Sequence, residues 1–429
     1  MATRLVYPFL FLCFLWSLPP GCTPEDRAIR AEGRVRIVFK HGKIAGDPEW
    51  FRKLLDRFEE KNPGIRVIEE TLPASTDEQH QFYGINLEGR SRDFDLLSMD
   101  VIWVPEFSRA GWIRDLTDLC PEEEQSKFFP ATVEANTYRG RLYGVPWYID
   151  AGVLYYRKDL LDRYGFSPPK TWAELVKIAQ TILRRERDPQ LRGFIWQGKQ
   201  YEGLVCNVLE YVWGNGGAVL DRENRVVIDH PPAEEALAFM RDLIDRYQIT
   251  PDFVTTATEE PTRHIFGNGQ AVFLRNWPYA WNLFQREGSK VKGQVGIAPL
   301  PGFQAGQGAA TLGGWQLGIN RFSEHPEEAG RLIQFLTSEE AQRSLALQVG
   351  YKPTRMALYQ DQALREAQPF VEALYPIFLQ ARPRPVTPYY VMISQILQAE
   401  FSAILAGVKE PGAALQSAKR KIEYILQLE

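Results

Sequence analysis

The chain has 429 residues, which is too long for one simple core, so two domains or one large bilobal unit are expected. Its composition, with 45% hydrophobic and 24% charged residues, excludes a disordered or fibrous protein. The formal net charge is −4 with the two signs interspersed, so no basic stripe can neutralise a phosphate backbone, and nucleic acid is not an expected partner.

The N-terminus is typical of a targeting segment. Arg4 precedes the apolar run LVYPFLFLCFLWSL, which is too short to span a bilayer comfortably and matches a signal-peptide core. PPGC follows, and its small residue directly before Cys22 resembles a bacterial lipobox, although the prolines depart from that pattern. We predict a signal peptide over residues 1–21, lipidation of Cys22 and a polar tether over residues 22–33. Simple cleavage and secretion is the alternative.

Two cysteines, Cys120 and Cys206, are left in the mature chain. They lie far apart, and no CxxC or HxxxH spacing accompanies them, so no metal site is predicted. We expect them to be small buried hydrophobic side chains, and a disulfide between them is permitted outside the cytoplasm.

Strand-like and helical runs alternate at the start of the mature chain. The predicted strands are 34–42, 65–73 and 93–100, and the predicted helices are 47–64 and 104–116. Asp47 is the expected N-cap of the first helix. Such alternation favours a largely parallel sheet covered by helices, with ligands beyond the carboxyl ends of its strands. Asp100 closes one of these strands, and capping of the next helix is its alternative role.

Residues 144–172, GVPWYIDAGVLYYRKDLLDRYGFSPPKTW, mix a buried-strand pattern with a proline, an aspartate and several tyrosines. Pro146 between two β-rich runs argues against one uninterrupted central strand. We therefore expect the chain to leave one sheet here and enter another. A helix is predicted over residues 171–186, with Thr171 as N-cap and Glu174 in the capping-box position.

The segment GRLYGVPWYIDAGVLYYRKDLLDRYGFSPPKTWAEL closely resembles the signature of extracellular sugar-binding proteins that feed ABC importers, the maltose-binding superfamily. FIWQGKQYEGLVC, FGNGQAVFLRNWPYAW, VGIAPLPG, AATLGGWQLGIN and RPRPVTPYY match, in order, the branch that binds trehalose and maltose. The resemblance implies an α/β fold of two lobes, each a sheet flanked by helices, that close on a sugar. The implied lobes are residues 34–146 with 311–352, and residues 147–310 with 353–429.

The resemblance also implies a site of carboxylates, a guanidinium and aromatic plates. Carboxylates accept hydrogen bonds from sugar hydroxyls, arginine donates a fixed fork of N–H groups, and aromatic rings stack on C–H faces. Core packing of the tryptophans, a surface salt bridge of Arg384 and capping by Asp47 are the alternatives. Trp281 is assigned to the core, and Glu202 and His80 are left outside the site. The implied ligand-binding residues are Asp47, Asp100, Tyr148, Asp150, Trp277, Tyr279, Gly314, Trp315 and Arg384.

The function that the resemblance implies is the extracytoplasmic binding component of an ABC sugar importer. It would bind trehalose or maltose as a monomer, without cofactor or metal, and deliver the disaccharide to permease subunits from the periplasm or the cell surface. Asp100 and Asp150 could imitate the paired carboxylates of a glycosidase, but no catalytic motif supports an enzyme. Another oligosaccharide or a polyol stays an alternative ligand, because fold alone does not determine specificity.

Overall fold

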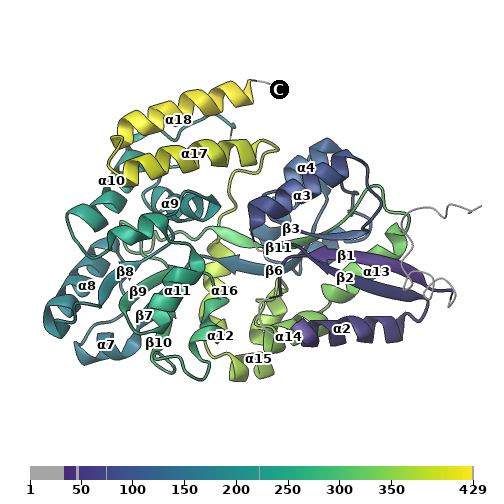
Figure 1. Cartoon of the computed structure of the whole chain (residues 1–429), viewed down its shortest axis with the longest axis horizontal. Coiled ribbons are helices and arrows are strands. Elements are labelled where there is room, and N and C mark those ends of the chain that lie inside the picture. The colour runs from purple at the N-terminus through teal and green to yellow at the C-terminus, as the bar shows by residue number, and fades with distance from the viewer. Residues whose placement is uncertain (1–32, 45–47, 74, 222, 428–429) are drawn as a thin grey trace, which may run out of the picture.

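The computed structural model describes residues 33–44, 48–73, 75–221 and 223–427. Within them the chain forms two α/β lobes that lie side by side, one around a five-stranded sheet and one around a four-stranded sheet (Figure 1). The predicted signal peptide, Cys22, Asp47 and all of the tether except Gly33 lie outside the described residues.

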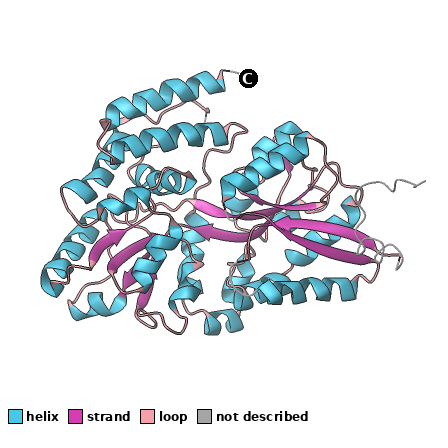
Figure 2. Cartoon of the chain, in the orientation of Figure 1, coloured by secondary structure: helices cyan, strands magenta, loops and turns pink. Residues whose placement is uncertain are grey.

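The sheet of the first lobe has the strand order β2-β1-β3-β11-β6 and carries helices on both faces (Figure 2). β1, β2 and β3 are parallel, whereas β11 runs antiparallel to β3 and to β6. Neighbouring side chains of a strand point to opposite faces, so Phe39 packs in one core cluster and Val38 in another. The strands are β1 (Val35–His41), β2 (Ile65–Thr71), β3 (Leu96–Asp100), β6 (Val145–Ala151) and β11 (Leu312–Ile319).

Helices α2, α13 and α14 contribute to the cluster around Phe39, and α3 and α4 contribute to the cluster around Val38. α4 is shorter than expected because Gly111, in the left-handed conformation at φ +71°, ends it. The bounds in this lobe are α2 (Pro48–Lys61), α3 (Thr76–Glu88), α4 (Val104–Ala110), α5 (Glu122–Gln125), α6 (Pro130–Ala135), β4 (Thr137–Tyr138), β5 (Arg141–Leu142), α13 (Pro326–Leu336) and α14 (Glu339–Gln348).

The sheet of the second lobe has the strand order β10-β7-β9-β8, and β8 and β9 alone among these neighbours pair in parallel. The largely parallel sheet was predicted for the start of the mature chain, where β1, β2 and β3 are indeed parallel. The strands are β7 (Val153–Arg157), β8 (Arg192–Ile195), β9 (Ala271–Asn276) and β10 (Val295–Ala298).

The helices of the second lobe enclose this sheet, and α17 and α18 lie together at the top of Figure 1. The predicted capping box of α8 is confirmed: Thr171 Oγ1 accepts from the Glu174 amide at 3.2 Å, and Glu174 Oε2 accepts from the Thr171 amide at 3.3 Å. The bounds are α7 (Lys158–Arg163), α8 (Trp172–Glu186), α9 (Glu202–Gly214), α10 (Pro231–Asp245), η1 (Asp252–Thr256), α11 (Glu259–Gly267), α12 (Ala280–Phe284), η2 (Met356–Gln360), α15 (Gln362–Ala367), α16 (Val371–Gln380), α17 (Tyr390–Leu405) and α18 (Pro411–Leu426).

The chain passes from the first sheet to the second at Gly152, between β6 and β7. A Cβ atom at Gly152 would lie 1.9 Å from Glu210 Oε1, so only glycine fits this passage. Pro146 lies inside β6 and does not separate two strands as expected; β6 ends the strand order of its sheet, where proline is tolerated. A bulge follows, because Trp315 pairs with Tyr148 while the next residue of β11 pairs with Pro146.

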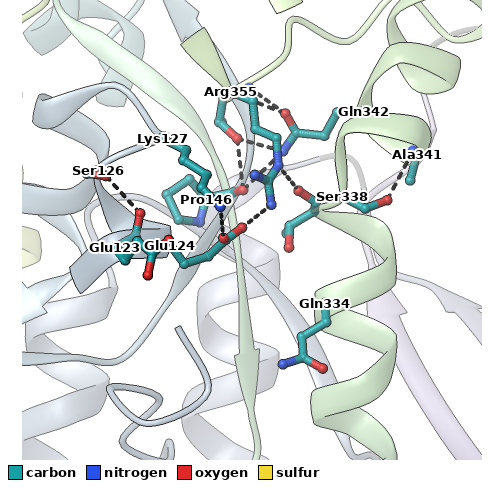
Figure 3. A network of polar contacts seen from close by, with 12 residues as sticks. Glu123, Glu124, Ser126, Lys127, Pro146, Gln334, Ser338, Ala341, Gln342 and Arg355 are labelled. Carbon is teal, nitrogen blue, oxygen red and sulfur yellow. Dashed lines mark hydrogen bonds and ion pairs between the residues drawn. The ribbon is translucent and has the colours of Figure 1, made fainter. Parts of the chain in front are cut away.

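A later crossover is tied to the first lobe by the polar network of Figure 3. The Gln342 side chain donates to Thr354 Oγ1 at 2.6 Å and accepts from the amides of Thr354 and Arg355 at 2.9 and 3.1 Å. The Arg355 guanidinium forms an ion pair with Glu124. Tyr359, a few residues on, is buried in the core cluster of the second lobe. The chain thus passes from contacts with the first lobe at Arg355 to the core of the second lobe at Tyr359, and the exact lobe boundaries stay a prediction.

Cys120 and Cys206 are both buried and free, as expected of small hydrophobic side chains. The permitted disulfide does not form between them.

Candidate functional site

Three of the predicted ligand-binding residues form one row across β3, β11 and β6. Trp315 pairs with Asp100 on one side and with Tyr148 on the other, and paired positions of neighbouring strands project to the same face. Tyr148 stacks on Tyr351 with ring centroids 3.9 Å apart, and Trp315 meets Trp103 edge-on at 5.6 Å. The row therefore places a carboxylate beside aromatic rings that are themselves held by other rings.

Two glycines of β11 extend this row toward the second lobe. A Cβ atom at Gly314, which has φ +107°, would lie 2.3 Å from the Tyr148 carbonyl oxygen, so glycine is required for the close approach of β11 to β6. A Cβ atom at Gly313 would lie 3.0 Å from Trp277 Cζ3 and 3.4 Å from Asp150 Cβ. Trp277 and Asp150 thus flank the same glycine.

The surroundings of Asp150 bring the pKa of its carboxyl group close to neutral pH. Burial raises its pKa to about 7, against the opposing effect of the cations Lys352 and Arg275. Burial lowers the pKa of Lys352 to about 7, and its Nζ donates to Gln368 Oε1 at 2.8 Å. The two groups lie on neighbouring segments, because the Ile149 amide donates to the Lys352 carbonyl at 3.0 Å.

Arg384 joins the row to the second lobe. Its Nη2 donates to Asp100 Oδ1 and to the Leu312 carbonyl, both at 3.3 Å, and its Nη1 donates to Glu202 Oε1 at 2.8 Å. Glu202 also accepts from Tyr390 Oη at 2.6 Å. Arg384 is 5% exposed, so its ion pairs form a buried network and not the surface salt bridge that was the alternative. Within the described residues Arg384 Nε has no hydrogen-bond partner, which leaves it as a donor.

Asp100, Tyr279 and Trp281 each make a further contact that bears on their predicted roles. Asp100 also accepts from the Ile102 amide at 3.2 Å, so it fixes the turn before α4 in addition to holding Arg384. Tyr279 Oη donates to Glu260 Oε1 at 2.7 Å, which attaches this ring to α11 rather than to the first lobe. Trp281 packs on Phe370 at 4.4 Å against the core cluster of the second lobe, in agreement with its assignment to the core.

Sequence reasoning missed several residues that shape this site: Glu202, Arg275, Tyr351 and Lys352. Glu202 belongs to a matching segment but has no motif of its own, and its role depends on Arg384, which lies far along the chain. Tyr351 and Lys352 precede a proline in a crossover between the lobes. Their part in the site follows only from the position of this segment beside β6, which the sequence does not show. His80, which was left outside the site, pairs with Glu106 at 2.8 Å.

Three cavities lie away from these residues, and one of them, of about 440 Å³, is lined by Arg34, Asp56 and Glu59. Another of about 720 Å³ lies between the end of α18 and the loop before α10, and one of about 400 Å³ lies beside Cys120, Phe128 and Arg355. The described part of the chain has no group of three or more His, Cys, Asp and Glu side chains that could hold a metal ion. Nor does any helix within it have the length and apolar character needed to cross a membrane.

The chain belongs to the bacterial extracellular solute-binding proteins, because the model of that family matches residues 42–343. A probable ABC transporter-binding protein of Deinococcus radiodurans is 38% identical over 413 residues, which cover 94% of this chain and 97% of that protein. The chain is therefore similar to solute-binding proteins along almost its whole length.

Solved structures agree with this assignment. A structure of maltose-bound T. maritima MalE3 has 44% sequence identity and a TM-score of 0.85, over 91% of this chain and 99% of that chain. A solute-binding protein of a Thermotoga lettingae ABC transporter, bound with α-D-tagatose, has 26% identity and a TM-score of 0.79, over 92% and 99% of the two chains. The protein is thus the solute-binding protein of an ABC transporter, with the two-lobed fold of its relatives.

Proposed function

We propose that this protein binds an α-glucosyl disaccharide, maltose or trehalose, and delivers it to the permease subunits of an ABC importer. The observation that carries the proposal is the row of Asp100, Trp315 and Tyr148 across three strands, continued by Asp150 and Trp277 around Gly313. The row combines carboxylates with aromatic rings, which suit the hydroxyl rim and the C–H faces of a pyranose. The similarity to maltose-bound MalE3 supports the same ligand class.

We propose the following roles for these residues. Asp100 and Asp150 accept hydrogen bonds from sugar hydroxyls, and Arg384 donates through its unpartnered Nε. Trp277 and Trp315 provide stacking faces, and Gly314 contributes a backbone contact to the sugar. Tyr148 lines the row and Tyr279 extends the proposed site, and Asp47, which lies outside the described residues, stays a proposed ligand-binding residue from the family resemblance. The residues come from both lobes, so a bound sugar stabilises the arrangement in which the lobes meet.

The proposed setting is outside the cytoplasm. Residues 1–21 would be removed as a signal peptide, Cys22 acylated, and the mature monomer attached to the membrane by its lipid alone. The lobes would be residues 34–146 with 311–352, and residues 147–310 with 353–429. No cofactor or metal takes part.

A calorimetric panel tests the ligand. Mature protein is titrated with maltose, trehalose, tagatose and mannitol, and we expect saturable binding of maltose or trehalose in preference to the other two. Trp277→Ala should weaken that binding by about thirtyfold, as loss of a stacking hot spot does. Trp281→Ala is the matched control and should lower the melting temperature with little change in affinity. Preference for tagatose or mannitol would establish the alternative ligand class.

A turnover assay tests whether the protein only binds. Prolonged incubation with maltose or trehalose should leave both disaccharides intact, because the proposed site has acceptors and stacking faces without a catalytic motif. Free glucose that accumulates above a control without protein, and disappears in Asp150→Asn, would establish a glycosidase instead.

A further inference from the structure

The ring of Trp277 is fixed on several sides at once. The guanidinium carbon of Arg275 lies over it, 4.2 Å from the ring centroid, and the indole Nε1 donates to Glu259 Oε1 at 3.3 Å. The Cζ3 edge of the ring lies 3.0 Å from the place of a Cβ atom at Gly313, and the Trp277 carbonyl accepts from Tyr155 Oη at 2.9 Å. Trp277 is only partly buried, and Arg275 covers one of the two faces of its ring.

Arg275 is itself held in one orientation. Its Nε donates to Glu210 Oε2 at 2.8 Å and its Nη2 to Glu210 Oε1 at 2.5 Å, a two-point contact that fixes the plane of the guanidinium. Its Nη1 donates to Gln197 Oε1 at 3.3 Å, and Glu210 also accepts from the Thr311 amide at 3.2 Å. Both charged side chains are 1% exposed. The guanidinium group that covers Trp277 is therefore held rigidly.

Stability alone explains this ion pair poorly. Burial of two charges costs desolvation that their attraction often only offsets, and well-packed apolar residues in the same place are often as stable or more stable. The pair nevertheless lies directly behind a ring of the proposed sugar site, and Gly152 keeps the space that Glu210 needs. A role in placing Trp277 accounts for both facts.

We infer that Arg275, fixed by Glu210, is a positioning residue for sugar binding. It covers one face of Trp277 and holds the indole so that the opposite face alone can stack on a pyranose ring. This inference rests on the proposed function, and it adds a residue that acts on the sugar only through Trp277. Because the ring is held in advance, little conformational entropy is lost when a sugar stacks on it.

A double-mutant cycle in sugar binding tests the inference. The variant Arg275→Met/Glu210→Gln removes the guanidinium group that covers Trp277 and leaves no buried charge unpaired. With Trp277 present it should weaken maltose binding by about tenfold. In the Trp277→Ala background the same double substitution should change the affinity less than about twofold, because the ring through which Arg275 acts is gone. Both backgrounds are titrated at pH 9, where Asp150 is ionised with or without the Arg275 cation that lowers its pKa. The fall in melting temperature, which reports any purely structural role, should be alike in both backgrounds.

Gly313→Ala should displace the ring of Trp277 and leave the ion pair of Arg275 and Glu210 intact. This variant replaces the double variant in the experiment if the double variant does not fold. The added methyl group would lie 3.0 Å from Trp277 Cζ3, closer than side-chain contacts normally are. Affinity should fall in the presence of Trp277 and stay unchanged in Trp277→Ala. Equal losses in both backgrounds, or wild-type affinity in either variant, would overturn the inference while the proposed function stands. A wild-type protein that binds no maltose or trehalose would overturn the proposed function as well.

Discussion

The affinity for sugar should rise with pH through neutrality, because Asp150 must be ionised to accept hydrogen bonds with both oxygens. Burial raises its pKa to about 7, so the carboxyl gains and loses its proton in the range where most binding measurements are made. A neutral carboxyl offers one fewer acceptor and presents a donor instead.

The size of the effect follows from this pKa. At pH 6 about one-eleventh of Asp150 is ionised, and at pH 8 about ten-elevenths. If the ionised form alone binds sugar productively, the dissociation constant falls about tenfold between these values, or about 1.4 kcal/mol.

Calorimetry at pH 6, 7 and 8 measures the profile for wild type and two variants. Asp150→Asn cannot ionise, so its profile should be flat. Lys352→Met removes a cation that lowers the pKa of Asp150, so its profile should shift to higher pH. Because Lys352 also titrates near neutrality, the wild-type midpoint belongs to the pair. A flat wild-type profile, or one that Asp150→Asn retains, would refute the reasoning.

The stability of the ligand-free protein should change in the opposite direction. The folded protein keeps a proton on Asp150 that the unfolded chain releases at about pH 4, so folding binds protons between about pH 4 and pH 7. The free energy of unfolding that this group contributes therefore falls as pH rises through that window. Denaturant unfolding at pH 5 and pH 8 should show a larger fall in wild type than in Asp150→Asn, because Glu202 and Glu210, whose pKa values burial also raises, contribute to both proteins; a fall of equal size in both would assign it to other groups.

Three further predictions concern the network, closure and anchoring. Glu202→Gln should weaken sugar binding by about tenfold or more and lower the melting temperature, because it leaves the buried Arg384 with Asp100 as its carboxylate partner; calorimetry with wild-type affinity would contradict this. Saturating maltose should reduce the radius of gyration in solution scattering, and an unchanged profile would contradict closure of the lobes. Cys22→Ser with the native signal should move the protein from the membrane fraction to the soluble fraction, whereas wild type that is already soluble would exclude the anchor.

Local patterns in the sequence predicted the features that depend on local physics. The capping box of α8 needs Thr171 and Glu174 alone, which are close in sequence, and it forms as expected. The sequence after Pro146 also predicted that the chain passes from one sheet to another, but it did not predict the residue at which it does so. The structure places it at Gly152 because Glu210, from a distant helix, fills the space that any other side chain would need.

The candidate site could be predicted only as far as the family resemblance reached. That resemblance supplied Asp100, Trp315 and Tyr148, and the strand register brings them into one row. The residues that hold or tune them had no local signal, because Lys352 and Arg275 act through burial and through partners far along the chain.

A crystal structure of the protein with bound maltose tests the central proposal most directly. We expect one disaccharide between the lobes, with a pyranose ring on the face of Trp277 that lies away from Arg275 and with hydroxyls in hydrogen-bond contact with Asp100 and Asp150. Maltose bound in the 720 Å³ cavity beside α18, with these residues free of ligand, would contradict it.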